Sequence, residues 1–301
     1  MAFLAAHIVL AYAAGLTARM VQSRNLDFFS IMGLNYLVGF AGAVIWMGLA
    51  GGWQADAPTI GFGILQGTHF ATSMVGSYLM FQRVGLGVTF TLIYMAVIVP
   101  TVGSSVLFDE RLSGLGLAGA ILLVVSIPLV AWRSEDQRRS VALEWWYWLL
   151  VGGLMAITGA GLTGAKAFDE LSVIGHRPTY VAVAFATTVP IALVTFLVRH
   201  RIQPGLRRFR DVATGRYGSP VLELSVAASI GIGFGTANAS QLAFFVLALR
   251  DVPGTVAFPV ATATLVLLST LAGYVFWHER HGRKTIAGGV VAITGLVLVN
   301  F

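Results

Sequence analysis

The fold is decided by two stretches of sequence, FDERLSGLGLAGAILLVVSIPLV at residues 108–130 and FWHERHGRKTIAGGVVAITGLVLV at residues 276–299. Each stretch ends one apolar run with a Glu-Arg pair, Glu110-Arg111 or Glu279-Arg280, and then begins a second apolar run that contains glycine. The first pair lies in the first half of the chain and the second pair lies near its end. A signature that recurs at such a distance indicates two copies of one structural unit.

More residues match at nearly the same offset and in the same order. The pattern GIxxGTxxA at residues 63–71 recurs at 231–239, and the motif AGLT occurs at 14–17 and at 160–163. Helix composition alone produces a few such matches, but not an ordered series, so the chain is predicted to be duplicated. The further matches, at the same offset as the two glutamates, are Gly85 with Gly254, Val97 with Val266, Thr101 with Thr270, and Ala118-Gly119 with Ala287-Gly288.

The composition places these units in lipid. Of the 301 residues, 57% are hydrophobic and only 11% are charged, whereas soluble proteins carry about 25% charged residues. Such a chain cannot cover a solvated surface, so a soluble enzyme is excluded and a lipid bilayer is the expected partner. There is no cysteine, which excludes disulfides, zinc-thiolate sites and thiol nucleophiles. Neither a cofactor nor a metal is expected.

Apolar runs of about twenty residues, the length that crosses hydrocarbon, predict ten helices. A signal peptide is the alternative for the first run, and it is disfavoured because no basic residue precedes the run. The predicted organisation is one five-helix repeat at 1–132, a linker at 133–144 and a second five-helix repeat at 145–301. The helices are expected at about 2–20, 28–50, 57–81, 84–108, 113–132, 145–168, 178–199, 221–249, 254–277 and 284–301.

Lysine and arginine are divided unevenly among the connections between these runs. The connections after the first, third, fifth, seventh and ninth runs hold 15 of the 19 basic residues, and the others hold 4. Basic connections face the cytoplasm, so both termini are predicted outside the plasma (inner) membrane, with the Arg-rich loop 200–219 inside. The net charge of +6 is then explained by the orientation of the chain in the membrane, with its basic connections in the cytoplasm. No nucleic acid is expected as a partner.

An odd number of helices in each repeat has a geometric consequence. Five crossings bring the second copy into the membrane from the opposite side, so the two halves are inverted. The predicted fold is therefore an all-α polytopic membrane protein with ten transmembrane helices in two inverted five-helix repeats. Secondary transporters are commonly built in this way, because exchanging the conformations of the two halves turns a central site from one side of the membrane to the other.

The chain resembles the drug/metabolite transporter (DMT) superfamily, and specifically its ten-helix EamA-like members. The resemblance rests on the two stretches quoted above, each with a Glu-Arg pair after the fourth helix of its repeat, and it extends over nearly the whole chain. It implies a secondary carrier with a central cavity, lined mainly by the first four helices of each repeat. The two Glu-Arg pairs are interpreted as a structural signature, because glutamate at a helix end can cap the next helix or pair locally.

Polar side chains inside the apolar runs are the candidate binding residues, because hydrocarbon tolerates them only when they face protein or water. Gln66, His69 and Ser73 are spaced by three and four positions, which aligns them on one helix face. His69 is expected either to bind substrate and carry a coupling proton, or to be a neutral histidine bonded to a neighbouring helix. The predicted substrate-binding set is Gln66, His69, Ser73, Tyr94, Asn238, Gln241, Thr262, Asn35 and His7.

Other features are interpreted structurally. The duplicated pattern GIxxG puts two glycines on one helix face, which is typical of close helix packing. Pro100 and Pro259 are expected to bend their helices and free carbonyl groups. Lys166 is expected to extend to the membrane interface, and attraction of an anionic substrate is the alternative.

The predicted function is that of a secondary active transporter, moving a small polar organic metabolite such as a sugar or an amino acid by alternating access. An enzyme is not expected, since the motifs HExxH, GxSxG and GxxxxGK[ST] and paired carboxylates within a run are missing from the sequence. The alternative is a non-transporting membrane protein, either a lipid-handling enzyme or a sensor scaffold. A lipid-handling enzyme should cluster acidic residues or histidines at one membrane face, and a scaffold would not need two polar helix faces.

Overall fold

A computed structural model of the protein describes residues 1–23, 27–84, 93–110, 113–130, 145–202, 220–277 and 282–298. Helices and short connections make up these residues, and no strand occurs among them. The α-helices are α1 (Ala2–Ser23), α2 (Phe28–Leu49), α3 (Ala57–Val84), α5 (Ile98–Leu107), α6 (Gly114–Val130), α7 (Trp145–Leu171), α8 (Arg177–Ile202), α10 (Pro220–Asp251), α11 (Gly254–Trp277) and α12 (Arg283–Leu298), and a 3-10 helix, η2 (Ile174–His176), precedes α8.

Most of the expected helices are present as single helices with ends close to the expected ones. The fourth differs: residues 85–92 lie outside the described part of the chain, and the helix is interrupted at Ala96 and Val97 before α5 begins. Pro100 accounts for the interruption, because its ring lacks an N–H and collides with the carbonyl group one turn earlier, that of Ala96. By contrast, α11 continues as a helix through Pro259.

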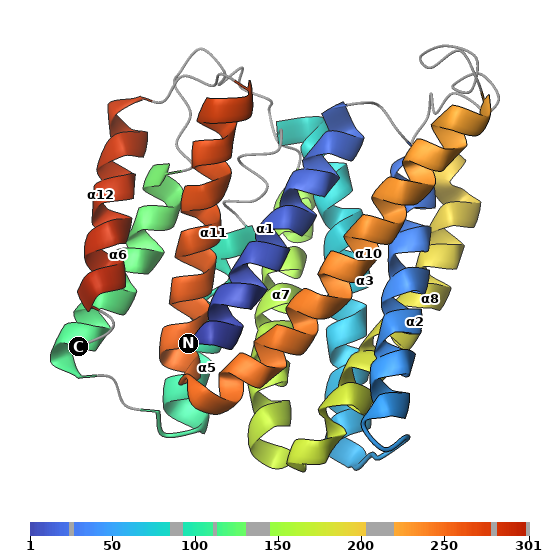
Figure 1. The fold of residues 1–301 in the computed structure, drawn as a ribbon. Helices are drawn as coiled ribbons and strands as arrows, with labels where there is room; N and C mark the ends of the chain where they lie inside the picture. Colours follow the sequence, from blue (N-terminus) through green and yellow to red (C-terminus); the bar gives the residue numbers. More distant parts are fainter. Residues whose placement is uncertain are drawn as a thin grey trace.

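The helices form one bundle in which partners far apart in sequence lie side by side. The pair α6 and α12 forms one edge, and α2 packs against α8 at the other (Figure 1). Between these edges, α1 packs against α10, α3 against α7, and α5 against α11. The connections α2–α3, α7–α8 and α10–α11 lie at the lower end of the bundle as drawn in Figure 1, and α8 ends and α12 begins at the upper end. Arg199, Arg283 and Lys284 lie at this upper end.

Several of the helices are long and apolar enough to cross a membrane. Four meet this description by length and composition: Phe28–Leu49, Leu149–Leu171, Arg177–Arg199 and Ser225–Asp251. Five shorter apolar segments accompany them, at Ala2–Ala18, Ile93–Leu107, Gly114–Ile127, Gly254–Ser269 and Ile286–Leu298. The structure is therefore that of a helical, membrane-type protein.

The duplicated glycines bring two pairs of helices into backbone contact. A Cβ atom on Gly67 of α3 would lie 2.2 Å from the carbonyl oxygen of Ala184 on α8. A Cβ atom on Gly235 of α10 would lie 2.6 Å from the carbonyl oxygen of Asn35 on α2. Without a side chain at these positions, helix backbones approach closely and gain dispersion contacts that lipid does not provide. The packing interpretation of the duplicated pattern is confirmed.

The contact at Gly67 predicts a local cost for any larger residue. Gly67→Ala should lower the free energy of unfolding by about 1 to 3 kcal/mol, because α3 and α8 must separate to admit the methyl group. Gly61→Ala on the same helix is the matched control, since a Cβ atom there has no neighbour within 4 Å. Thermal unfolding of both variants in detergent measures the difference. Equal melting temperatures would contradict the packing argument.

Candidate binding cavity

A cavity of about 280 Å³ lies between the two halves of the chain, among α1, α3, α7, α10 and α11. This volume is close to the lower limit of small-molecule sites, which is about 300 Å³. Asn35 is fully buried and does not line the cavity itself, but its side chain bonds to Asn238. The other eight residues selected from the sequence line the cavity directly: His7, Gln66, His69, Ser73, Tyr94, Asn238, Gln241 and Thr262.

One polar wall of the cavity comes mainly from α3 and α7. The Tyr180 hydroxyl donates to Oε1 of Gln66 at 3.4 Å, and the Gln66 amide nitrogen lies 3.4 Å from Nδ1 of His69. One turn further along α3, the Ser73 hydroxyl bonds to that of Thr158 at 3.1 Å. The spacing of three and four positions expected from the sequence therefore does align these groups on one face, which we call the α3 wall.

The opposite polar wall comes from α1, α2 and α10. Nδ1 of His7 bonds to the backbone carbonyl oxygen of Gln241 at 2.9 Å. The Gln241 side chain donates to Oδ1 of Asn238 at 2.6 Å, and the Asn238 amide donates to Oδ1 of Asn35 at 3.3 Å. These bonds form a chain across three helices, which we call the α10 wall. Its buried end, Nδ2 of Asn35, has no hydrogen-bond partner among the described residues.

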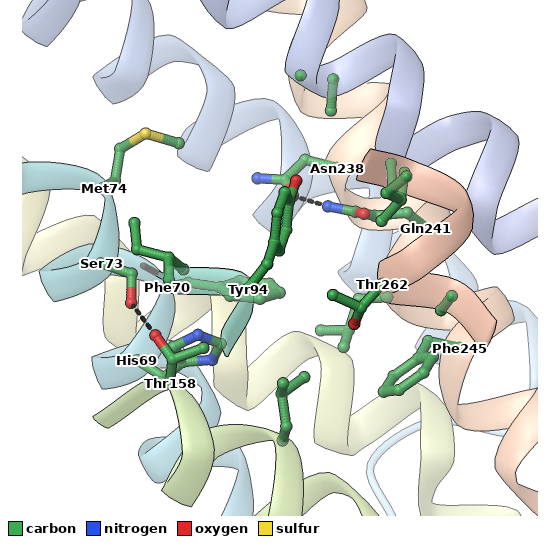
Figure 2. A pocket seen from close by; sticks show the side chains of 18 of the residues that line it. His69, Phe70, Ser73, Met74, Tyr94, Thr158, Asn238, Gln241, Phe245 and Thr262 are labelled. Atoms are coloured by element: carbon green, nitrogen blue, oxygen red, sulfur yellow. Dashed lines mark hydrogen bonds between the residues drawn. The ribbon is translucent and has the colours of Figure 1, made fainter. Parts of the chain in front are cut away.

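Apolar and aromatic side chains line the cavity between the two walls. Figure 2 shows Ser73 and Thr158 on one side and Asn238 and Gln241 on the other, with the Tyr94 ring between them. The polar groups of each wall thus bond mainly to groups of their own wall. The centre of the cavity is lined mainly by rings and aliphatic groups, with the hydroxyl of Thr262 beside them.

Among the aromatic and polar residues of the lining, the sequence did not single out Tyr36, Phe70, Thr158, Phe234, Phe245 and Phe258. Aromatic residues are common in buried helix contacts, so nothing in the sequence separates these from the rest of the core. Thr158 carries a weak signal, because it is a hydroxyl within an apolar run, close to the duplicated AGLT motif. The cross-helix bond to Ser73 is visible only in three dimensions.

Lys166 does not extend to an interface, so that expectation was wrong. It is 3% exposed, and its ammonium group lies 2.8 Å from Glu110 and 2.6 Å from Glu170. The second carboxylate oxygen of Glu110 accepts the backbone N–H of Thr255 at 3.0 Å, at the start of α11. Glu110 thus joins α7 to the first turn of α11.

A second buried ion pair lies nearby. Arg177, at the start of α8, pairs with Asp169 of α7 and donates through Nε to the carbonyl oxygen of Val246 on α10 at 3.2 Å. Lys166 lies one helical turn, about 6 Å along the axis, beyond the lining residue Leu162. We call Lys166, Glu110, Glu170, Arg177 and Asp169 the ionic cluster. It lies beyond the lower end of the cavity lining.

Asp56 ties two connections together at the same lower end. It accepts the backbone N–H of Thr59 at 2.8 Å at the start of α3, and both of its oxygens lie 3.0 Å from the hydroxyl of Ser172. Its Oδ2 atom also lies 3.1 Å from Nδ1 of His176. Burial opposes ionisation of Asp56, but the hydrogen bonds from Thr59, Ser172 and Val173 outweigh burial and hold the pKa well below its ordinary value.

Some predicted features lie outside the described residues. These are Arg111, Glu279, Arg280, the linker 133–144 and most of the basic loop, from 203 to 219. Within the described part of the chain, no group of three or more His, Asp or Glu side chains is arranged to hold a metal ion.

Comparison with known proteins relates the fold to solved structures only. No protein-family model and no curated protein matches the chain. Among solved structures, 28 chains resemble it. One of these, described only as "Crystal structure of protein", has 13% identical residues, aligns over 98% of each chain and gives a TM-score of 0.67. A likeness at that identity concerns the fold and carries no information about activity.

The ionic cluster predicts a specific pattern of losses. Lys166→Met leaves the partly buried Glu110 without its cation and should lower the free energy of unfolding by about 1 to 3 kcal/mol. Adding Glu110→Gln removes the unpaired charge and retains an acceptor for Thr255, so the double variant should recover part of the loss. A double-mutant cycle by thermal unfolding measures the coupling between the two residues. Purely additive losses would show that they do not interact.

The bonds to Asp56 predict a pH dependence. Because its pKa is lowered by folding, its contribution to stability is fully present above the ordinary value of 3.8 and is lost as the pH falls through the lower native value. Asp56→Asn should therefore lower the melting temperature at pH 7, and the gap to the unaltered protein should narrow below pH 3.8. Melting curves over this pH series test the prediction. A gap that stays constant with pH would contradict it.

Proposed function

We propose that this chain is a secondary transporter that moves a small polar organic metabolite across the plasma membrane by alternating access. The observation that carries the proposal is the cavity between the two halves, with two facing polar walls to which helices of both halves contribute. We also propose that the chain belongs to the ten-helix EamA-like group of the DMT superfamily. This part of the proposal rests on the two Glu-Arg stretches of the sequence.

The helix contacts support an inverted-repeat construction with α1, α2, α3, α5 and α6 as counterparts of α7, α8, α10, α11 and α12. Exchanging each helix for its counterpart turns the α1–α10 contact into α7–α3, the α2–α10 contact into α8–α3, and the α1–α11 contact into α7–α5, all of which occur. The pairs α2–α8, α5–α11 and α6–α12 each join a helix to its own counterpart. A two-fold relation of this kind lets the halves exchange conformations.

The two ends of the cavity differ in a way that suits alternating access. Towards the upper end the lining reaches Ala18 and Ser77, in the later turns of α1 and α3. Towards the lower end it stops at Leu162 and Phe258, and the ionic cluster follows. Under the proposal, the upper end faces the cytoplasm, and the ionic cluster is the contact that breaks when the carrier opens to the outside.

Filling the cavity should stop transport. A Cβ atom on Gly15 has no neighbour within 4 Å, and Gly15 lines the cavity, so Gly15→Leu extends into the space of the substrate without displacing a helix. Gly42→Leu is the matched control, because Gly42 is exposed on α2 and equally unobstructed. Uptake of a labelled metabolite panel into proteoliposomes should fall at least tenfold in the first variant and remain unchanged in the second.

Two outcomes would contradict the proposal. If the unaltered protein moves no solute of the panel, or if Gly15→Leu transports as fast as Gly42→Leu, the cavity is not a transport site. Melting temperatures of both variants, measured alongside, separate a blocked cavity from a misfolded protein.

A further inference from the structure

The geometry of the cavity points to a substrate class: we propose that the ligand is an uncharged molecule with a flat apolar body and a hydrogen-bonding group at each end. This inference rests on the proposed function only in treating the cavity as the substrate site. It narrows the sugars, amino acids and related solutes admitted by the sequence to solutes without charge, and it adds a requirement for an aromatic or similarly flat centre.

The first step concerns charge. None of the described residues that line the cavity is Asp, Glu, Lys or Arg. In the ionic cluster, beyond the lower end of the lining, the charges are already paired: Lys166 is bonded to two carboxylates and Arg177 to Asp169. A charged ligand would lose its hydration shell and gain no counterion, which costs several kcal/mol for an unpaired buried charge. An uncharged ligand avoids that cost.

The second step concerns His7, on the α10 wall. Its Nδ1 atom lies 2.9 Å from the carbonyl oxygen of Gln241. A carbonyl oxygen only accepts hydrogen bonds, so Nδ1 carries the proton. In the neutral ring, Nε2 is then an acceptor, and it has no hydrogen-bond partner among the described residues. The α10 wall therefore offers the ligand an acceptor.

The third step concerns His69, on the α3 wall. The Tyr180 hydroxyl donates a hydrogen bond to Oε1 of Gln66, and the amide nitrogen of the same side chain faces Nδ1 of His69. An amide nitrogen only donates, so Nδ1 accepts and the ring proton of His69 is on Nε2. Within the described part of the chain, Nε2 has no partner. The α3 wall thus offers a donor, opposite in kind to the acceptor of His7.

The fourth step concerns the space between the walls. Phe70, Tyr94, Phe245 and Phe258 line it together with aliphatic groups, and the volume is about 280 Å³. Rings prefer offset-stacked or edge-to-face contact with other rings. A planar ligand can therefore donate a hydrogen bond to His7, accept one from His69 and stack its flat body against the rings between the walls.

A set of four indoles of nearly equal size tests this inference: indole-3-acetamide is uncharged, indole-3-acetate is an anion, tryptamine is a cation and tryptophan is a zwitterion. Binding to the purified full-length protein is measured by the ligand-dependent rise in melting temperature over a concentration series. The amide should bind at least about tenfold more tightly than each charged relative, which corresponds to about 1.4 kcal/mol or more. Gly15→Leu should abolish the effect, and Gly42→Leu should retain it.

Two results would overturn the inference. The first is a charged indole that binds as tightly as the amide, and the second is the absence of any binding that Gly15→Leu removes. Uptake of the amide into proteoliposomes is measured separately. Binding without uptake would support the substrate class and refute the transport function. Uptake of a charged indole in preference to the amide would support the transport function and refute the substrate class.

Discussion

Polar groups enclosed by apolar helices have no water to bond, and this constraint governs the rest of the structure. Most such groups therefore find partners inside the chain. The backbone does so by forming helices. The side chains do so in compact sets, namely the α3 wall, the α10 wall and the ionic cluster, each of which joins helices that are distant in sequence. Where two backbones must come close for this to happen, glycine permits it, as at Gly67 and Gly235.

The two halves share the GIxxGTxxA pattern but contribute different side chains to the cavity. When the two GIxxGTxxA patterns are aligned, Gln66 corresponds to Phe234 and Asn238 to Phe70, and all four line the cavity. A polar residue of one half thus has an aromatic counterpart in the other. The shared glycines make similar helix contacts in both halves, while exchanges of this kind place the polar groups at different positions on the two walls.

Much of this architecture could be predicted from the sequence, because hydrophobic runs and their spacing depend on local residue pattern. The helix ends, the break caused by Pro100 and the close approach at the repeated glycines are of this kind. The partners of Lys166 could not be predicted, because Glu110 is distant in sequence and the pairing depends on how α5, α7 and α11 pack. The polar members of the lining were found because hydrocarbon penalises them; the aromatic members, such as Phe70, carry no such penalty and looked like core.

The bonds within each polar wall also bear on how strongly the cavity can hold a ligand. The side chains of Gln66 and Asn238 and the amide nitrogen of Gln241 are already bonded to protein groups, so an incoming molecule gains mainly from atoms without a partner and from contact with the rings. Modest affinity follows, since each net hydrogen bond contributes only about 0.5 to 1.5 kcal/mol. For a carrier, weak retention is an advantage: the residence time of the cargo stays short, and release does not limit the number of cycles per second.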